Sequence, residues 1–193
     1  DRGNLQWERF FSDMGPSIVY DIDVAPDGGC IVVGSVPIDP TTSDDVDGLV
    51  IRLDADGGMV WRRAIDRSGW DHLNAVVCTF DGGYAMAGAS GATLSGAYFD
   101  LWLLRLDAAG GTLWSKAYGG AGNEFGNALV QTRDGGFCIA GFITEYDEGS
   151  NGMYLLKTDE AGNKLWSLTP GERFDDRAYA VCRLDDAAPG ERE

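Results

Sequence analysis

The sequence predicts an all-β repeat protein, and three observations support this. Trp7, Trp61, Trp114 and Trp166 follow one another at intervals of 54, 53 and 52 residues. Glycine supplies 28 of the 193 residues, about twice its ordinary share, which indicates many tight turns. No segment carries the i, i+3, i+4, i+7 apolar stripe of an amphipathic helix, so the chain has the pattern of short strands and turns.

Two phrases recur with this spacing. One ends at a tryptophan and reads LDADGGMVW, LDAAGGTLW and TDEAGNKLW. The other contains a D-G-G turn and reads APDGGCIVVGS at 25–35, TFDGGYAMAGAS at 79–90 and TRDGGFCIAGF at 132–142. Three copies of two independent phrases establish a repeat of about 53 residues.

Each repeat predicts four strands, lettered a to d in chain order. Strand a is VYDIDVAP, NAVVCTF or NALVQTR, and strand b follows the D-G-G hairpin turn as CIVVGS, YAMAGA or FCIAGF. Strand c is LVIRLD, LWLLRLD or MYLLKTD. After a second glycine turn, strand d is MVWRRA, TLWSKAY or KLWSLT. The expected four-stranded units span about 17–66, 71–118 and 124–169, with a terminal strand d at 5–11 and a terminal strand a at 178–184.

Four antiparallel strands per repeat, with a tryptophan and glycines in each, are typical of a β-propeller. We therefore predict a single domain over 1–193, with about three complete blades and the terminal strands of a partial fourth. Strands b and c of that fourth blade are missing from the sequence. We expect either a piece of a longer propeller or a ring that a partner completes. The chain opens at Asp1 without a signal peptide, as a mature or excised segment would.

The D-G-G-[aromatic]-x-x-x-G and L-D-x-x-G-x-x-x-W phrases resemble the β-propeller repeats of secreted and surface proteins of bacteria and archaea. The resemblance covers nearly the whole chain and implies an extracellular, periplasmic or cell-surface location, but no single activity. The second phrase is also similar to the tryptophan-docking motif of quinoprotein dehydrogenase propellers, although it lacks the threonine before the glycine.

In either family an indole on the outermost strand lies against the next blade. Such an indole buries about 200 Å², which at about 25 cal/mol per Å² stabilises a blade interface by at most about 5 kcal/mol. We assign this structural docking role to Trp7, Trp61, Trp114 and Trp166.

The charge of the chain is strongly acidic, with 31 acidic against 15 basic residues and a net charge of −16. A phosphate backbone or an anionic membrane would be repelled, so we expect no nucleic-acid partner. The longest apolar stretches have about six residues, so we expect no transmembrane segment. Other protein chains, cations and uncharged glycans remain as partners.

The cysteines and the single histidine give little support to a metal or catalytic site. Cys30, Cys78, Cys138 and Cys182 include no closely spaced pair, which argues against zinc. Each lies among valine, isoleucine and alanine, so buried inert thiols are favoured over a nucleophile paired with His72. The even count leaves disulfides open.

The a–b and c–d turns are short and uniform, and they are expected to form one rim of the disc, the short-turn rim. Their aspartates and glycines suit turn geometry. A calcium site on Asp54–Asp56, Asp107 and Asp159 would lack the full run of spaced oxygens that a calcium loop supplies. The basic residues two positions before the c–d turn are expected to form structural charge pairs with turn acids: Arg52, Arg105 and Lys157.

The b–c and d–a loops are longer and differ between repeats, as functional loops often do, and they form the opposite, long-loop rim. Asp71, Glu124 and Asp176 share one repeat position just before strand a. The candidate ligand-binding residues are Asp71, Glu124, Asp176, Asp47, Asp100, Tyr98, Trp70, Tyr146 and Asp147, with Asp44, Asp45, Phe99 and Glu148 beside them. This rim would suit a divalent cation such as Ca²⁺, a basic peptide or a sugar ring. The structural alternative is that the three aligned acids bind backbone amides at the start of strand a.

No sequence feature marks a catalytic centre. A glycosidase needs two carboxylates about 5–10 Å apart, and no pair is singled out among many acids. Quinoprotein chemistry needs a complete ring of blades, and nucleophile-elbow, P-loop and dinucleotide motifs are missing. We predict a non-catalytic protein–protein interaction or scaffolding module without a cofactor. Glycan or divalent-cation binding on the long-loop rim is the first alternative, and a hydrolase or quinoprotein-type enzyme fragment the second.

Overall fold

The computed structural model describes residues 3–11, 15–39, 45–67, 69–91, 98–120, 122–144, 151–170 and 175–183. Within these ranges the chain forms twelve strands and no helix, which confirms the all-β prediction. None of the described residues therefore forms a helix of the length and hydropathy that a membrane span requires. The strands are β1 (Ile18–Val24), β2 (Cys30–Pro37), β3 (Val46–Leu53), β4 (Met59–Ile65), β5 (Trp70–Cys78), β6 (Tyr84–Gly91), β7 (Phe99–Leu106), β8 (Thr112–Tyr118), β9 (Asn123–Gln131), β10 (Phe137–Thr144), β11 (Asn151–Thr158) and β12 (Lys164–Leu168).

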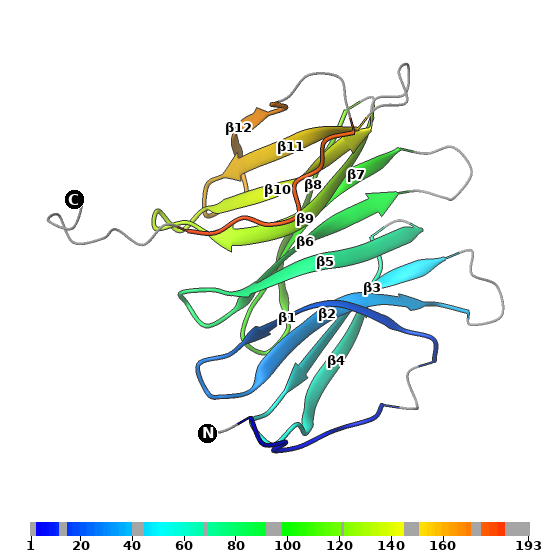
Figure 1. Ribbon diagram of the computed structural model, residues 1–193, viewed down its shortest axis with the longest axis vertical. Helices are drawn as coiled ribbons and strands as arrows, with labels where there is room; N and C mark the ends of the chain where they lie inside the picture. Colours follow the sequence, from blue (N-terminus) through cyan, green and yellow to red (C-terminus); the bar gives the residue numbers. More distant parts are fainter. Residues whose placement is uncertain are drawn as a thin grey trace, which may run out of the picture.

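Three four-stranded antiparallel units follow one another along the chain (Figure 1). Unit 1 is β1–β4, unit 2 is β5–β8 and unit 3 is β9–β12, and within each unit every strand pairs with the one before it. A single parallel bridge between Val46 of β3 and Trp70 of β5 links units 1 and 2. This bridge makes β1–β8 one eight-stranded sheet, beside the four-stranded sheet of unit 3.

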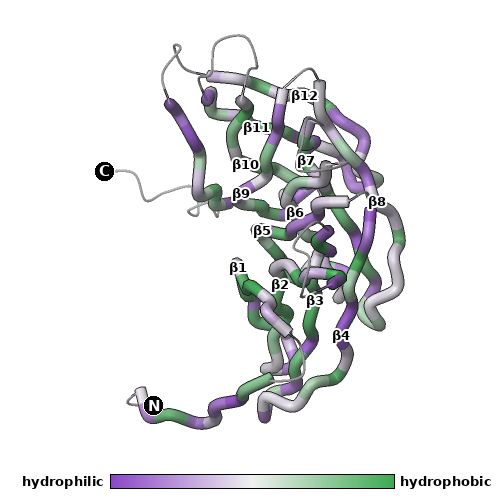
Figure 2. Tube along the Cα trace, turned by 90° about the vertical axis from the view of Figure 1, so that its right-hand side faces the viewer, coloured by the Kyte–Doolittle hydropathy of each residue, from purple (hydrophilic) through white to green (hydrophobic). Residues whose placement is uncertain are grey.

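The units pack on one another mainly through their first strands. β5 contacts β1 and β2 of unit 1, and β9 contacts β5, β6 and β7 of unit 2. Figure 2 shows the units along an arc, with β1, β5 and β9 toward its concave side and β4 and β8 on the outside. Because successive strands within a unit are antiparallel, the starts of its first and third strands lie at the same end of the unit.

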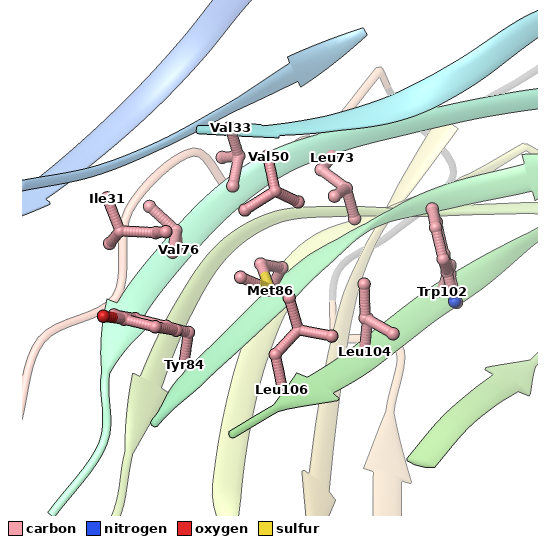
Figure 3. Close-up of a cluster of buried hydrophobic side chains, with 10 residues drawn as sticks. All are labelled: Ile31, Val33, Val50, Leu73, Val76, Tyr84, Met86, Trp102, Leu104 and Leu106. Carbon is pink, nitrogen blue, oxygen red and sulfur yellow. The ribbon is translucent and has the colours of Figure 1, made fainter. Parts of the chain in front are cut away.

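Two core clusters consist of side chains that face a neighbouring unit, while a third, on β2 and β3 of unit 1, packs with Phe11 of the N-terminal segment. At the interface of units 1 and 2, Trp102 and Leu104 of β7 join residues of β2 and β3 in one cluster (Figure 3). Their chain neighbours Leu101 and Leu103 point to the other side, where they pack with residues of unit 3. Unit 2 therefore buries both faces of its middle strands, which explains why β7 reads as a nearly continuous apolar run.

A bulge recurs on the first strand of each unit, opposite a glycine of the second strand. The register shifts between Val19 and Asp21 on β1, between Leu73 and Ala75 on β5, and at the corresponding place on β9. The glycines allow the bulged backbone to approach closely. A Cβ atom added to them would lie 1.8, 1.9 and 1.7 Å from a carbonyl oxygen of the first strand: Gly34, Gly88 and Gly141.

The tryptophans lie over the glycine of the c–d turn in the following unit. A Cβ atom on Gly57 would fall 2.7 Å from the Trp7 ring, and one on Gly110 or Gly162 would contact the ring of Trp61 or Trp114. Each of these glycines has a positive φ, between 73° and 80°. The turn thus needs glycine for its backbone and presents a flat surface to the indole.

Edge-to-face contacts complete the docking of Trp61 on Tyr84 and of Trp114 on Phe137, with ring centroids 5.9 and 6.0 Å apart. Trp7 also donates a hydrogen bond to the Ala55 carbonyl oxygen at 3.0 Å. Trp166 differs, because no turn glycine of the described chain lies beneath its ring, although its exposure of 43 % is close to the 38 % of Trp7. Its predicted docking role is therefore unfulfilled within the described residues.

The expected terminal strands are not present as strands. Residues 5–11 and 178–183 belong to neither sheet, and residue 184 lies outside the described residues. A strand needs a ladder partner, and the second and third strands of a fourth unit are missing from the sequence. Both segments still follow the repeat: residues 3–11 bring Trp7 onto unit 1, and the Asn127 amide nitrogen donates to the Ala178 carbonyl oxygen at 3.0 Å, just as Asn74 donates to Gly126.

The repeated basic residues of strand c do form charge pairs, and the partner is the aspartate of the D-G-G turn. The three pairs are Arg52 with Asp27 at 2.5 Å, Arg105 with Asp81, and Lys157 with Asp134 at 3.0 Å. The cationic side chains are 6–12 % exposed, while the carboxylates remain well exposed. The c–d turn acids have another task, since Asp54, Asp107 and Asp159 accept hydrogen bonds from amides of their own turns.

Replacing Arg105 by leucine should destabilise the protein by about 2–4 kcal/mol, because two buried carbonyl oxygens lose their donor. The Arg105 guanidinium donates to the carbonyl oxygens of Leu106 at 2.6 Å and Tyr84 at 3.0 Å. Arg105→Lys should retain most of the stability, because Lys157 fills the same role in unit 3. Urea unfolding of both variants measures this, and equal losses for leucine and lysine would contradict it.

Candidate functional site on the long-loop rim

The predicted acids gather in two repeat-related groups at the unit interfaces. Each acid is the second residue of its strand: Asp47 of β3, Asp71 of β5, Asp100 of β7 and Glu124 of β9. Asp71 and Glu124 are 0 and 3 % exposed, and Asp47 is 9 % exposed. The two interfaces thus each hold an acid from strand c of one unit and an acid from strand a of the next.

Asp71 and Glu124 each close the loop that precedes them. The Arg67 backbone amide donates to Asp71 Oδ2, and the Gly120 amide donates to the Glu124 carboxylate. Both donors stand four residues before the acid, so the two hydrogen bonds are repeat equivalents. This geometry agrees with the structural alternative for these two residues.

Asp176 does not join such a pair. Its backbone amide donates to the Asn151 carbonyl oxygen at 2.9 Å, and the residue is only half-buried. Glycine stands at position 152, where β3 and β7 have Asp47 and Asp100. The carboxylate pair is therefore specific to the interfaces of unit 2.

Asp100 and Glu124 approach one another beside Gly119. A Cβ atom on Gly119 would lie 1.8 Å from Asp100 Oδ1 and 2.9 Å from Glu124 Oε2, so a larger residue there would displace the two carboxylates. Glu124 Oε2 is buried and has no hydrogen-bond partner among the described residues. Burial raises the pKa of Glu124, and the charge of Asp100 raises it further.

Asp47 lies in a larger group of acids. Burial, followed by the charges of Asp66, Asp45 and Asp71, raises the pKa of Asp47 to about 6. Asp66 follows β4 and stands where unit 2 has Gly119, so this interface has more carboxylates than the next.

Trp70 lines a cavity of about 380 Å³ between units 1 and 2. Its walls include Ile18 and Tyr20 of β1, Val46 of β3 and His72 of β5. Among the other predicted aromatics, Tyr98 is 44 % exposed. Tyr146 and Asp147, together with Asp44 and Glu148, lie outside the described residues.

Residue size explains why the cavity is at this interface. The same three repeat positions line both interfaces of unit 2. Between units 1 and 2 they hold Ile18, Val46 and His72, and between units 2 and 3 they hold His72, Phe99 and Phe125. There Phe99 and Phe125 pack together with centroids 5.4 Å apart, each 6.0 Å from the His72 ring. Isoleucine and valine are smaller than these rings, so the first interface keeps a space that aromatic side chains fill in the second.

The aromatic stack was not predicted from the sequence. It continues from Phe125 to Phe142, with centroids 4.6 Å apart, and the Arg177 guanidinium lies 4.8 Å over Phe142. Burial lowers the pKa of His72 despite the opposing charge of Asp71, which keeps the imidazole neutral within the stack. The equivalence of His72 and Phe125 in the repeat was a signal that could have revealed it.

All four cysteines are free, which resolves the question left open by their even number. Burial raises the pKa of Cys30 and Cys138, and it raises that of Cys78 to about 12. These thiols are poor nucleophiles, and only Cys182 is exposed.

We expect iodoacetamide to alkylate Cys182 at least about tenfold faster than the other three cysteines in the native protein. The burial of the other thiols suppresses their thiolate forms and blocks the reagent. Peptide mass spectrometry after timed quenching measures the four rates. Comparable rates at Cys78 and Cys182 would contradict the observed burial.

The described residues contain no group of three or more histidine, cysteine, aspartate or glutamate side chains already arranged as a metal centre. The carboxylate groups at the two interfaces therefore offer buried negative charge without preformed coordination.

Comparison with known proteins supports the fold and leaves the activity open. No protein-family model matches the chain, and no curated protein matches it. A crystal structure of a protein of unknown function from Bacteroides caccae is similar, with a TM-score of 0.55 and 10 % identity over 93 % of this chain. The chain spans about half of that protein, 54 % of its length. At this identity the likeness concerns the fold alone.

Proposed function

We propose that the three units are consecutive blades of a β-propeller that serves as a non-catalytic protein–protein interaction or scaffolding module. In this proposal the chain is a segment or an accessory subunit of a larger assembly at an extracellular, periplasmic or cell-surface location. The proposal depends on one observation, the uncovered face of unit 3.

The middle strands reveal this uncovered face. In β7 of unit 2, the six residues from Leu101 to Leu106 are all buried, because units 1 and 3 cover both faces. In β11 of unit 3, buried Tyr154 and Leu156 alternate with half-buried Met153 and Leu155. One face of unit 3 therefore packs on unit 2, and the other leaves its apolar side chains only half-buried.

Trp166 lies on β12 beside this face and identifies what would cover it. In the three preceding copies, the tryptophan packs on the turn glycine of the next unit: Gly57, Gly110 and Gly162. A partner that covers Trp166 in the same way would be another four-stranded unit with a D-x-x-G turn. The similar Bacteroides caccae protein extends well beyond the part that matches this chain, which agrees with a fold that accommodates additional polypeptide.

The carboxylate pairs support a non-catalytic role. A glycosidase acid must reach the glycosidic oxygen of its substrate, but Glu124 is 3 % exposed and already accepts an amide hydrogen bond. Asp71 is fully buried and accepts the equivalent hydrogen bond. These acids stabilise loops between blades in this proposal.

Sedimentation velocity between about 1 and 100 µM tests the proposal, because a second copy of the chain supplies units of the required chemistry. We expect reversible association that Trp166→Glu weakens. Leu113→Glu is the matched control, because Leu113 is 55 % exposed on β8, as its repeat equivalent Leu165 is on β12. A wild-type chain that stays monomeric throughout, or association that Trp166→Glu leaves intact, would overturn the proposal.

A further inference from the structure

The cavity between units 1 and 2 has preformed walls that the proposed scaffolding role does not require. Two of its lining residues on β1, Ile18 and Tyr20, are about half exposed, so the cavity is accessible from solvent. The strand ladders fix the other walls. Ile18 pairs with Ser35 across β1 and β2, and Val46 lies opposite Trp70 at the parallel bridge between β3 and β5. A ligand of suitable size can therefore enter without a rearrangement of the backbone.

The next interface shows which kind of group this space accepts. At the repeat positions of Ile18 and Val46, unit 2 has His72 and Phe99. The Phe99 ring packs there on Phe125, with centroids 5.4 Å apart, and lies 6.0 Å from the His72 ring. Position 46 carries no ring, so the equivalent place between units 1 and 2 suits a flat aromatic ring that comes from a ligand.

The walls of the cavity already contain the side chains that such a ring contacts. Tyr20, Trp70 and His72 all line it, and offset or edge-to-face packing on them would stabilise an aromatic ligand. Burial lowers the pKa of His72, so its imidazole is neutral at neutral pH and does not repel a cation. The faces of tyrosine and tryptophan rings attract an ammonium group.

The charge around the cavity discriminates between aromatic ligands. Asp39 is one of the lining residues, and no lysine or arginine is among the lining residues that the structure describes. The whole chain carries a net charge of −16. A cationic ligand is therefore attracted to this cavity, and an anionic one is repelled.

We propose that the cavity binds a small aromatic amine, with the ring against Trp70 and His72 and the ammonium group toward Asp39. The ring takes the place that Phe99 fills between units 2 and 3. This inference is independent of the scaffolding proposal, because the cavity lies between two units of one chain and Trp166 is not part of its lining.

Calorimetric titration with phenethylamine and with phenylacetate tests the site on the full chain. The two compounds share an aromatic ring and carry opposite charges. We expect one phenethylamine per chain with a Kd below about 1 mM. Phenylacetate should bind at least about tenfold more weakly, and Asp39→Asn should remove most of this preference. No binding of phenethylamine at millimolar concentration, or equal binding of the two compounds by the wild type, would overturn the proposal.

A variant that fills the cavity separates a lost site from a lost fold. Val46→Phe supplies the ring that Phe99 supplies in unit 2, so the affinity for phenethylamine should fall at least about tenfold while the Tm stays at or above that of the wild type.

Trp70→Asn introduces the residue of the equivalent position 123 and should weaken binding at least about threefold, which keeps the test decisive if Val46→Phe does not fold. Tyr98→Ala is the control, because Tyr98 is an exposed aromatic residue outside the lining of the cavity, and it should leave the affinity unchanged. Affinity that survives in folded Val46→Phe and Trp70→Asn would contradict the assignment of the cavity as the binding site.

Discussion

Gly88→Ala should destabilise the protein by at least about 3 kcal/mol, because the new methyl group has no space. Its Cβ atom would lie 1.9 Å from the His72 carbonyl oxygen and 2.8 Å from the carbonyl carbon. Both are backbone atoms of the bulged strand β5, so the clash is relieved only by opening the β5–β6 ladder. This ladder supports the packing of unit 2 against both of its neighbours. Urea unfolding monitored by circular dichroism measures the loss.

Gly152→Ala is the matched control on β11. The nearest atom to its added Cβ is Ile143 Cγ2 at 3.6 Å, an ordinary contact. We expect a change within about 0.5 kcal/mol, or a slight gain from the lower entropy of the unfolded chain. Equal stabilities of Gly88→Ala and Gly152→Ala would contradict the close approach at the bulge.

Trp114→Ala should cost about 3–5 kcal/mol, because the indole packs between units 2 and 3. The ring contacts Gly162 and Phe137, and Lys116 Nζ lies 5.8 Å from its centroid. Its removal leaves a gap that the rigid turn below cannot close. Denaturant unfolding measures the loss.

Trp166→Ala provides the comparison within the same repeat. Because Trp166 is 43 % exposed, we expect its removal from the monomer to cost less than about 1 kcal/mol. Similar losses for Trp114→Ala and Trp166→Ala would mean that Trp166 is already docked, and the end face would not be open.

Local pattern was sufficient to predict most of the strands. The D-G-G turns and the alternation in segments such as YAMAGA follow from short-range stereochemistry. Packing of Trp61 and Trp114 was also predictable, since an indole repeated at this period most often serves a structural role. In contrast, residues 5–11 had the composition of a strand but no ladder partner, and isolated sequence does not reveal a missing neighbour.

The partners in the charge pairs could be predicted only from the register of the hairpin that β2 and β3 form. Arg52 lies near Asp54 in sequence, yet Cys30 pairs with Leu53 across β2 and β3 and thereby brings the D-G-G turn to the arginine. Asp54 meanwhile accepts amide hydrogen bonds within its own turn. Proximity in sequence therefore does not show which turn acid pairs with each basic residue.

The positions of the candidate site residues on the strands could be predicted, but which acids come together could not. The acids at the starts of strands c and a were identified, but their convergence between neighbouring units depends on how the units pack. Gly119 illustrates the limit, because its importance comes from the side chains of Asp100 and Glu124 on either side of it. The cavity beside Trp70 likewise depends on Ile18 and Val46 being smaller than their repeat equivalents.

Hydroxyl-radical footprinting of the monomeric chain, with mass spectrometry at each tryptophan, tests most directly whether unit 3 presents an unfilled docking face. We predict rapid oxidation of Trp166 and marked protection of Trp61 and Trp114, followed by protection of Trp166 when the chain associates. If Trp166 is as protected as Trp114 in the monomer, or stays reactive in the associated form, the end face of unit 3 is not an open docking face for a further unit.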